Sequence, residues 1–349
     1  MFYFDRVLTA NSRNLAEQWQ HVGQRRDFFD QMQANMQGMP QGNQAARIPT
    51  DVYRDIDSQT KKLMTGDEGG VLMAALMPLA KALPVGKIVA EYRRVSDSGN
   101  GNVSINGQAA KIIDKAVYDF DGALVLVHDD AYGRQWREVE GQRSEAFDAL
   151  IDDSENSVRT VRRSLVSHFV NGVSNVKYKE RTAPGIKSQA YAIDLGTSGL
   201  NIDLTSGSLT WANCEKAFIA FIQGLKGSSN NAEGRVKIFV SSQIWFNLQR
   251  TDGSGVDKQT FFQALMKMPD IMSIESTNDT SVLNGNQVLG FIPSSQYIQP
   301  VIGMATTTTP IVRMQPWDNY NFVTWSVAGI LVKSDYANRK GVFYARNMT

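Results

Sequence analysis

The chain has 349 residues, and its 36 Lys and Arg against 35 Asp and Glu give a formal net charge of +1. This balance does not predict a strongly basic nucleic-acid-binding face, and no apolar run reaches the ~20 residues that a membrane span needs. Cys214 is the only cysteine, which excludes an intramolecular disulfide and a CxxC zinc site. The first residues lack the basic start and apolar core of a signal peptide, so we expect synthesis in a reducing compartment.

The first 70 residues predict an extended arm. Residues 11–36 have the apolar spacing of a helix, and residues 37–46 form a connector rich in Gln, Gly and Asn. Their apolar content is too low for a core of their own. Residues 71–83 follow as a mostly apolar helical segment that Pro78 interrupts.

The next segment predicts a long polar hairpin. Residues 87–95 have the pattern of a strand, Asn106-Gly107 is a strong hairpin turn, and residues 109–127 return with a second turn at Asp121-Gly122. A two-stranded ribbon this polar is not stable alone in water. We therefore expect it to rest on another body, such as a second copy of the chain.

A helical stripe of apolar residues spans residues 132–172. Residues on this stripe recur in steps of three and four, and every eleventh position is apolar, which predicts one straight helix roughly 50–60 Å long. Asn171-Gly172 is a typical helix end, and Gly141 is a position for a kink. Its charges form either a solvated face of i,i+4 pairs or contacts with neighbouring subunits. The stripe consists of Trp136, Val139, Phe147, Leu150, Val158, Val161, Leu165 and Phe169.

The remaining residues predict a mixed α/β region without an internal repeat. The final block, residues 319–347, predicts two strands joined by a turn at residues 338–341. Before it we expect strands at 173–178, 235–240, 271–276, 287–293 and 300–306, and helices at 209–225, 241–250 and 260–268.

No constellation in the sequence predicts catalysis. Walker A, GxGxxG, GxSxG and HExxH patterns are all missing, and the DFDG motif at 119–122 has too few oxygen ligands for calcium. His21, His128 and His168 fall in different predicted elements, where we expect each at the surface or half-buried. Cys214 is expected to be a buried thiol. We therefore expect no catalytic, cofactor-binding or metal-binding residue, and no enzyme.

The order of these segments resembles the Hong Kong 97-type major capsid protein of tailed bacteriophages. The resemblance implies an α+β fold with an N-arm, an extended loop, a long spine helix in a peripheral domain, and an α/β axial domain. The segments that carry it are LPVGKIVAEYRRVSDSGNG, WREVEGQRSEAFDALIDDSENSVRTVRRSLVSHFVNG, TAPGI and NYNFVTWSVAGILVKSDYANRKGVFYA.

The resemblance also implies a division of the chain and a set of subunit contacts. The N-arm would be residues 1–70, the extended loop 88–128 and the axial domain 187–312. The peripheral domain would combine residues 71–87, 129–186 and 313–349, with the spine helix at 132–172. Inter-subunit contacts are expected at Arg93, Arg94, Asn100, Asn102, Lys111 and Lys115.

The function implied is a structural one. The chain would form pentamers and hexamers that close an icosahedral head around double-stranded phage DNA, assembled in the host cytoplasm and contacting the DNA without sequence preference. A separate scaffolding protein and a portal would be partners, with a decoration protein as an optional one, and no membrane or cofactor is involved. Lys87, Lys111 and Lys115 lie in or near the loop, but nothing pairs them with an Asn, so we do not expect subunit cross-links. An encapsulin-like compartment shell and an unrelated α/β enzyme remain alternatives.

Overall fold

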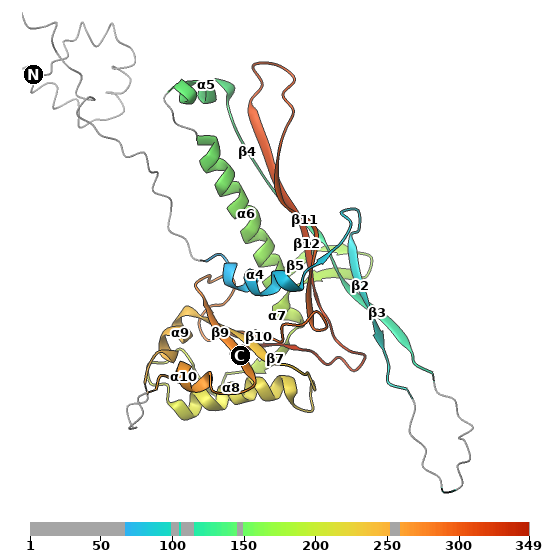
Figure 1. Cartoon of the computed structure of the whole chain (residues 1–349), viewed down its shortest axis with the longest axis vertical. Helices are drawn as coiled ribbons and strands as arrows, with labels where there is room; N and C mark the ends of the chain where they lie inside the picture. The colour runs from blue at the N-terminus through green and yellow to red at the C-terminus, as the bar shows by residue number, and fades with distance from the viewer. Residues whose placement is uncertain (1–66, 99–104, 106–114, 145–148, 252–258, 349) are drawn as a thin grey trace, which may run out of the picture. The chain divides into compact units, whose positions relative to one another are not determined.

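The computed structural model describes residues 67–98, 105, 115–144, 149–251 and 259–348 (Figure 1). The chain divides into Met1–Met64 and Thr65–Thr349. The first unit lies outside the described residues, so the helix expected at 11–36 is not described. The second unit carries every element below. None of its described helices is both long and apolar enough to cross a membrane.

One sheet supports the longest described helix, α6 (Ala149–Asn171). Val161, Leu165 and Phe169 of α6 are buried at spacings of four, so the predicted stripe does face the core. The helix lies along the strands in Figure 1, and its buried face packs with residues of the two inner strands of this sheet. In sheet order the strands are β1 (Lys81–Ala82), β11 (Ile298–Pro310), β12 (Tyr320–Val332) and β4 (Leu126–Arg134).

The prediction of one helix from residue 132 is wrong at its start. Tyr132 and Arg134 belong to β4, which pairs with β12 up to Arg134↔Tyr320. A separate helix, α5 (Trp136–Ser144), precedes α6, and Figure 1 draws the two apart. The side chain of Arg134 pairs with Asp153 of α6 and so joins this strand to the helix. Tyr132, where the predicted helix began, is a strand residue at the start position of the helical spacing. Phe147 lies outside the described residues, and Leu150 and Val158 are half-buried.

The helix end is as predicted. Gly172 has a φ of 79°, a left-handed conformation that terminates α6. A Cβ atom at this position would lie 2.4 Å from the backbone nitrogen of Gly185, so the site also requires close backbone approach. The elements that follow are β5 (Gly172–Tyr178), β6 (Arg181–Pro184) and α7 (Ile186–Gln189).

A five-stranded sheet and three helices form the second core. Cys214 is buried in it, as expected, beside Phe218 and Phe221. Ser241 caps one helix by accepting from the backbone nitrogen of Ile244, and Thr260 begins another with a capping box. In sheet order the strands are β7 (Tyr191–Asp194), β13 (Val342–Arg346), β10 (Val288–Phe291), β8 (Val236–Ser241) and β9 (Ile271–Thr277); the helices are α8 (Trp211–Lys226), α9 (Ser242–Leu248) and α10 (Phe261–Leu265).

The two closing strands do not form a hairpin with each other. β12 lies between β11 and β4, whereas β13 lies between β7 and β10 in the other sheet. Both strands are predicted correctly, but the turn between them crosses from one sheet to the other. Tyr344 of β13 and Ile330 of β12 share one buried cluster, so this crossing ties the two cores together.

The expected apolar helix at 71–83 is shorter than predicted. It ends at Leu76 as α4 (Gly70–Leu76), and Pro78 lies in the short 3-10 turn η3 (Met77–Leu79). Proline cannot donate the backbone hydrogen bond that would continue the helix. Leu72 and Leu76 of α4 pack in the same buried cluster as Phe169 of α6.

Candidate assembly interface

The predicted polar hairpin is present as β2 (Val89–Val95) and β3 (Tyr118–Leu124). The two strands pair antiparallel, and their inner ends are buried: Ala90 and Ala123 pack with Val301 of β11. The second turn expected at Asp121-Gly122 is wrong, because both residues lie within β3. Gly122 is needed there for close packing, since a Cβ would lie 2.2 Å from the carbonyl oxygen of Ala90.

Charged groups fix the direction of the hairpin at its root. Arg181 of β6 donates to Glu91 and Asp121, both at 3.1 Å, and to the carbonyl oxygen of Phe120 at 2.8 Å. Arg94 pairs with Asp119, whose pKa this hydrogen bond lowers. Single exposed pairs contribute little, but a network that links three strands restricts the hairpin to one orientation.

The outer part of the hairpin exposes apolar side chains that no other described element covers. The exposed fractions of Val95, Val117, Tyr118 and Phe120 lie between 46% and 56%. The guanidinium of Arg93 lies 5.1 Å from the centre of the Tyr118 ring. Apolar surface rimmed by charge is typical of a protein contact surface.

The loop between β11 and β12 is a second apolar surface. Asp318 holds it in shape by accepting from the backbone nitrogens of Met314 (2.9 Å) and Gln315 (2.8 Å), and Arg313 stacks 3.9 Å from the ring centre of Tyr320. These contacts define the conformation of the loop, yet its apolar side chains point to solvent. Their exposed fractions are 51% for Ile311, 80% for Val312, 87% for Met314 and 62% for Trp317.

Sequence reasoning missed this loop. Residues 311–317 lie between two predicted strands and carry four large apolar residues between or beside Pro310 and Pro316. Proline at both ends argues against a buried strand, so an apolar run there is a detectable sign of an exposed contact.

The comparisons with known proteins identify the family. The sequence matches the family described as "Family of unknown function (DUF6260)" over residues 43–345. The chain belongs to the DUF6260 family. No curated protein sequence matches it.

Comparison with solved structures identifies the fold of this DUF6260 protein. Its chain is similar to the capsid of Myoviridae phage XM1, with a TM-score of 0.66 and 11% identity over 86% of this chain and 99% of that one. For a chain of Microbacterium phage Oxtober96, the TM-score is 0.55 and the identity 13%, over 88% of this chain and 98% of that one. For a capsid chain of a native GTA particle, the TM-score is 0.53 and the identity 12%, over 88% of this chain and 98% of that one. The mixed α+β fold is therefore that of phage capsid chains, which confirms the resemblance to the Hong Kong 97 type.

Three of the six predicted contact residues are among the described residues of the DUF6260 chain. Arg93 and Arg94 lie on β2, and Lys115 is exposed just before β3. Asn100, Asn102 and Lys111 lie outside the described residues. The roles of all six as subunit contacts remain predictions.

Two histidines of the DUF6260 protein are buried, contrary to the expectation of surface or half-buried positions. His128 of β4 and His168 of α6 have exposed fractions of 6% and 1%. The packing of α6 on β4 brings the two histidines together although 40 positions separate them in the sequence. The local sequence around each histidine does not predict this contact. Burial lowers the pKa of His168 to about 4 and lowers that of His128, against a smaller opposite effect of Asp129.

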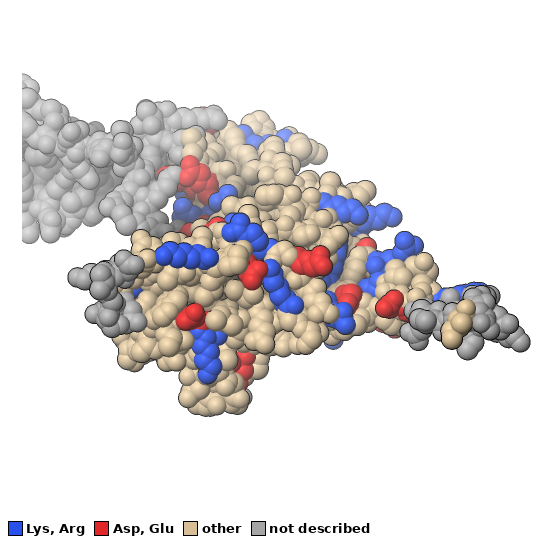
Figure 2. Space-filling model, turned by 60° about the horizontal axis from the view of Figure 1, so that its bottom comes forward, with Lys and Arg blue, Asp and Glu red and all other residues tan. Residues whose placement is uncertain are grey.

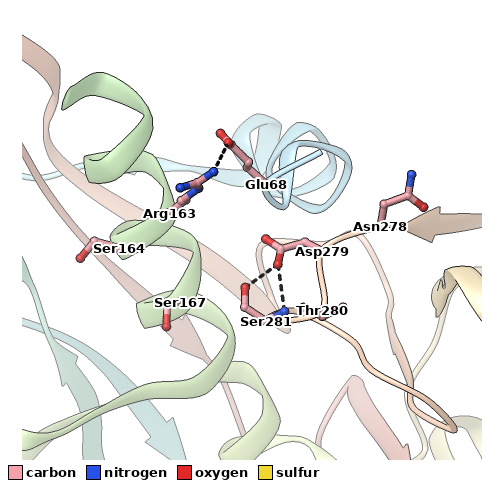
Figure 3. A pocket seen from close by; sticks show the side chains of 8 residues that line it. All are labelled: Glu68, Arg163, Ser164, Ser167, Asn278, Asp279, Thr280 and Ser281. Carbon is pink, nitrogen blue, oxygen red and sulfur yellow. Dashed lines mark hydrogen bonds and ion pairs between the residues drawn. The ribbon is translucent and has the colours of Figure 1, made fainter. Parts of the chain in front are cut away.

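A cavity of about 560 Å³ lies between α6 and the loop after β9 (Figure 3). Glu68 at its rim pairs with Arg159 and Arg163 of α6, while Asp279 accepts from the backbone and hydroxyl of Ser281 in its own turn. Glu68 thus joins two walls of the cavity, and Asp279 stabilises the turn that forms part of one of them. Within the described ranges, no group of His, Cys, Asp and Glu side chains is arranged to hold a metal ion.

Proposed function

We propose that this DUF6260 protein is the major capsid protein of a tailed bacteriophage and closes an icosahedral shell around double-stranded DNA. The observation that carries the proposal is the extent of the fold similarity. It covers 86% of this chain and 99% of a capsid chain of phage XM1, so nearly every segment of that chain has a counterpart here.

The uncovered ribbons support the same function. The hairpin β2–β3 and the loop at 311–317 together expose eight large apolar side chains that the described chain leaves in contact with water. Keeping such groups solvated is unfavourable, at about 25 cal/mol per Å² of apolar surface. A shell would bury these side chains of the hairpin and the loop between copies, whereas a monomer would leave them in contact with water.

Each segment then takes a role in the shell. Residues 1–70 are the N-arm, residues 88–128 the extended loop and residues 187–312 the axial domain. The peripheral domain combines residues 71–87, 129–186 and 313–349. Its spine helix is α6, which begins at Ala149 and not at residue 132, with α5 as a separate helix before it.

The remaining partners follow from the shell itself. Copies would form pentamers and hexamers in the host cytoplasm and become part of the virion. A separate scaffolding protein and a portal are required for a head that packages DNA, and a decoration protein is an optional addition. DNA would be contacted without sequence preference, in keeping with the net charge of +1.

Electron microscopy of the expressed chain tests the proposal. With a cognate scaffolding protein we expect closed icosahedral particles, and particles from infected cells should contain DNA and a portal at one vertex. Smaller shells filled with protein cargo would instead favour the encapsulin-like alternative. A small oligomer that never closes would contradict both readings.

A further inference from the structure

A basic pocket of about 500 Å³ lies beside the outer half of β2. Strand β2, residues 230–231, residues 296–297 and the turn between β12 and β13 line it. On the face that Figure 2 shows, Lys and Arg side chains are numerous toward the end of the molecule that carries the hairpin, with Asp and Glu side chains among them. The basic pocket is defined by its five cationic residues, Arg93, Arg94, Lys333, Arg339 and Lys340.

Acidic groups balance these cations only in part. Among the described residues that line the pocket, Asp335 is the only carboxylate, and it accepts from the backbone nitrogen of Arg339 to close its own turn. Among the described residues, no carboxylate lies within ion-pair distance of Arg93, Arg339 or Lys340. Only Arg94 is paired, with Asp119 and Asp121.

Two further groups in the pocket, the ammonium of Lys333 and the Nε of Arg94, lack a charged partner among the described residues. Lys333 donates only to neutral acceptors, the carbonyl oxygen of Ser295 and the side chain of Gln299. Lys333 and Lys340 are half-buried, and this burial lowers the pKa of both side chains, against a smaller opposite effect of Asp121 on Lys340. The Nε of Arg94 is buried without a hydrogen-bond acceptor. Cations held in this way favour an anionic ligand.

The same chain carries a compensating acidic segment, residues 129–155. It contains nine Asp and Glu and three Arg, which gives a net charge of 3 − 9 = −6. It comprises the end of β4, α5 and the start of α6. Among its described residues, Asp129, Glu138, Glu140 and Glu155 are exposed.

The acidic segment begins in the middle of β4, and most of it lies beyond the end of this strand that points away from the hairpin. β3 ends at Leu124 and β4 runs from Leu126 to Arg134, so this strand carries the chain about 25 Å away at ~3.3 Å per residue. In Figure 1, α5 lies at the far end of α6 from β2. The acidic segment of a different copy is therefore the better-placed partner for the pocket.

We propose that the basic pocket of one copy binds the acidic segment of a second copy. The inference rests on the proposed shell and adds the surfaces through which neighbours recognise each other. Two different surfaces meet in such a head-to-tail contact, which closes into rings when the rotation between copies allows it. Opposite charges at the two ends would also accelerate encounter and fix the relative orientation of the copies.

Charge reversal with rescue tests the contact. The variant Arg93→Glu/Arg339→Glu reverses two exposed cations of the pocket, and Glu140→Arg/Glu155→Arg reverses two exposed acids of the segment. A matched control, Lys216→Glu/Lys267→Glu, makes the same charge change on α8 and after α10. Assembly is followed by light scattering and electron microscopy, and the fold of each chain by circular dichroism.

Each reversed variant should remain folded and raise the concentration needed for assembly at least tenfold at low salt. Combining both reversals in one chain should restore assembly, and the control should behave as the wild type. A zero-length carbodiimide should also link Lys340 of one copy to residues 129–155 of an isotopically labelled second copy.

The proposal is overturned if folded pocket variants assemble as the wild type does, or if the combined reversal rescues nothing. It is equally overturned if the control variant is as defective as the pocket variant. Normal shells that lose only their DNA would mean that the pocket contacts nucleic acid instead. In all of these outcomes the wild type still forms shells, so the proposed function stands; a wild type that stays monomeric would overturn both.

Discussion

His128 of β4 and His168 of α6 form a buried hydrogen bond, with 3.0 Å between Nε2 of the first and Nδ1 of the second. The other ring nitrogen of His128 lies 2.8 Å from the hydroxyl of Ser164. One imidazole must donate to the other, so the pair cannot be doubly protonated without losing this bond. The pair therefore joins the longest described helix to the sheet only while at least one ring is neutral.

The pair predicts a loss of stability in mild acid. Folding lowers the pKa of His168 from 6.5 to about 4, so below pH 6.5 the unfolded chain binds more protons than the folded one. Its contribution is fully present above pH 6.5 and is lost as the pH falls towards 4, by about 3 kcal/mol at most. Urea unfolding at several pH values measures it.

The matched variant for this measurement is His168→Gln. Because carboxylates also titrate in this range, the comparison of interest is the difference in pH slope between variant and wild type. We expect the variant to be less stable at pH 7.5 and to lose less stability between pH 6.5 and pH 4.5. Parallel slopes would show that the histidine pair does not control acid stability.

The apolar stripe of α6 gives a prediction about stability alone. Leu165 is buried against the sheet, and Leu165→Ala should lower the free energy of unfolding by about 2–5 kcal/mol through lost burial and a residual cavity. Ile151 on the same helix is 58% exposed, so Ile151→Ala should change it by less than about 0.5 kcal/mol. Denaturant titration of the unassembled chains checks both, and equal effects would contradict the assigned face.

Sequence periodicity predicted which residues of α6 face the core but not where the helix begins. Val161, Leu165 and Phe169 follow the 3.6-residue period because a helix on a sheet buries one stripe. Tyr132, where the predicted helix began, fits the same spacing although it belongs to β4, which pairs with β12. A pattern of spacing alone cannot separate the helix from the strand.

Long-range pairing accounts for the other differences. β12 and β13 were both predicted, yet their partners lie in different sheets because strand neighbours are chosen by tertiary packing and not by sequence proximity. The histidine pair likewise depends on the alignment of β4 with α6. The basic pocket gathers residues from β2 and the β12–β13 turn, about 240 positions apart, so only Arg93 and Arg94 could be singled out beforehand.

The apolar loop at 311–317 predicts an assembly defect without unfolding. Trp317 is 62% exposed, so Trp317→Ser removes little buried area within the chain and should leave the thermal midpoint nearly unchanged. It removes a large apolar contact from the proposed interface, so fewer particles should form. Trp317→Phe keeps an aromatic surface and should assemble normally. Equal particle yields for the serine variant and the wild type would remove this loop from the interface.

Deleting residues 96–107, the predicted tip of the hairpin, should separate folding from assembly. The paired strands end at Val95↔Tyr118, and the buried residues Ala90 and Ala123 lie at the other end of the ribbon. The deletion leaves residues 108–117 to join the strands, so the two cores and the helical circular dichroism signal should persist. Closed particles should be lost or destabilised, because the deleted residues are expected to contact neighbouring copies, apart from Ser96, which bonds to the backbone of Val117.

A second variant separates the length of the tip from its side chains. Replacing residues 96–107 by an equally long Gly-Ser segment keeps the reach of the hairpin and removes its side chains. If particles return with this variant, the tip acts as a spacer; if they do not, its side chains make the contacts. Negative-stain microscopy and circular dichroism on the same preparations give both readouts. A deletion variant that forms particles of normal stability would show that the hairpin tip is not an assembly element, and one that loses its helical signal would place the tip in the core.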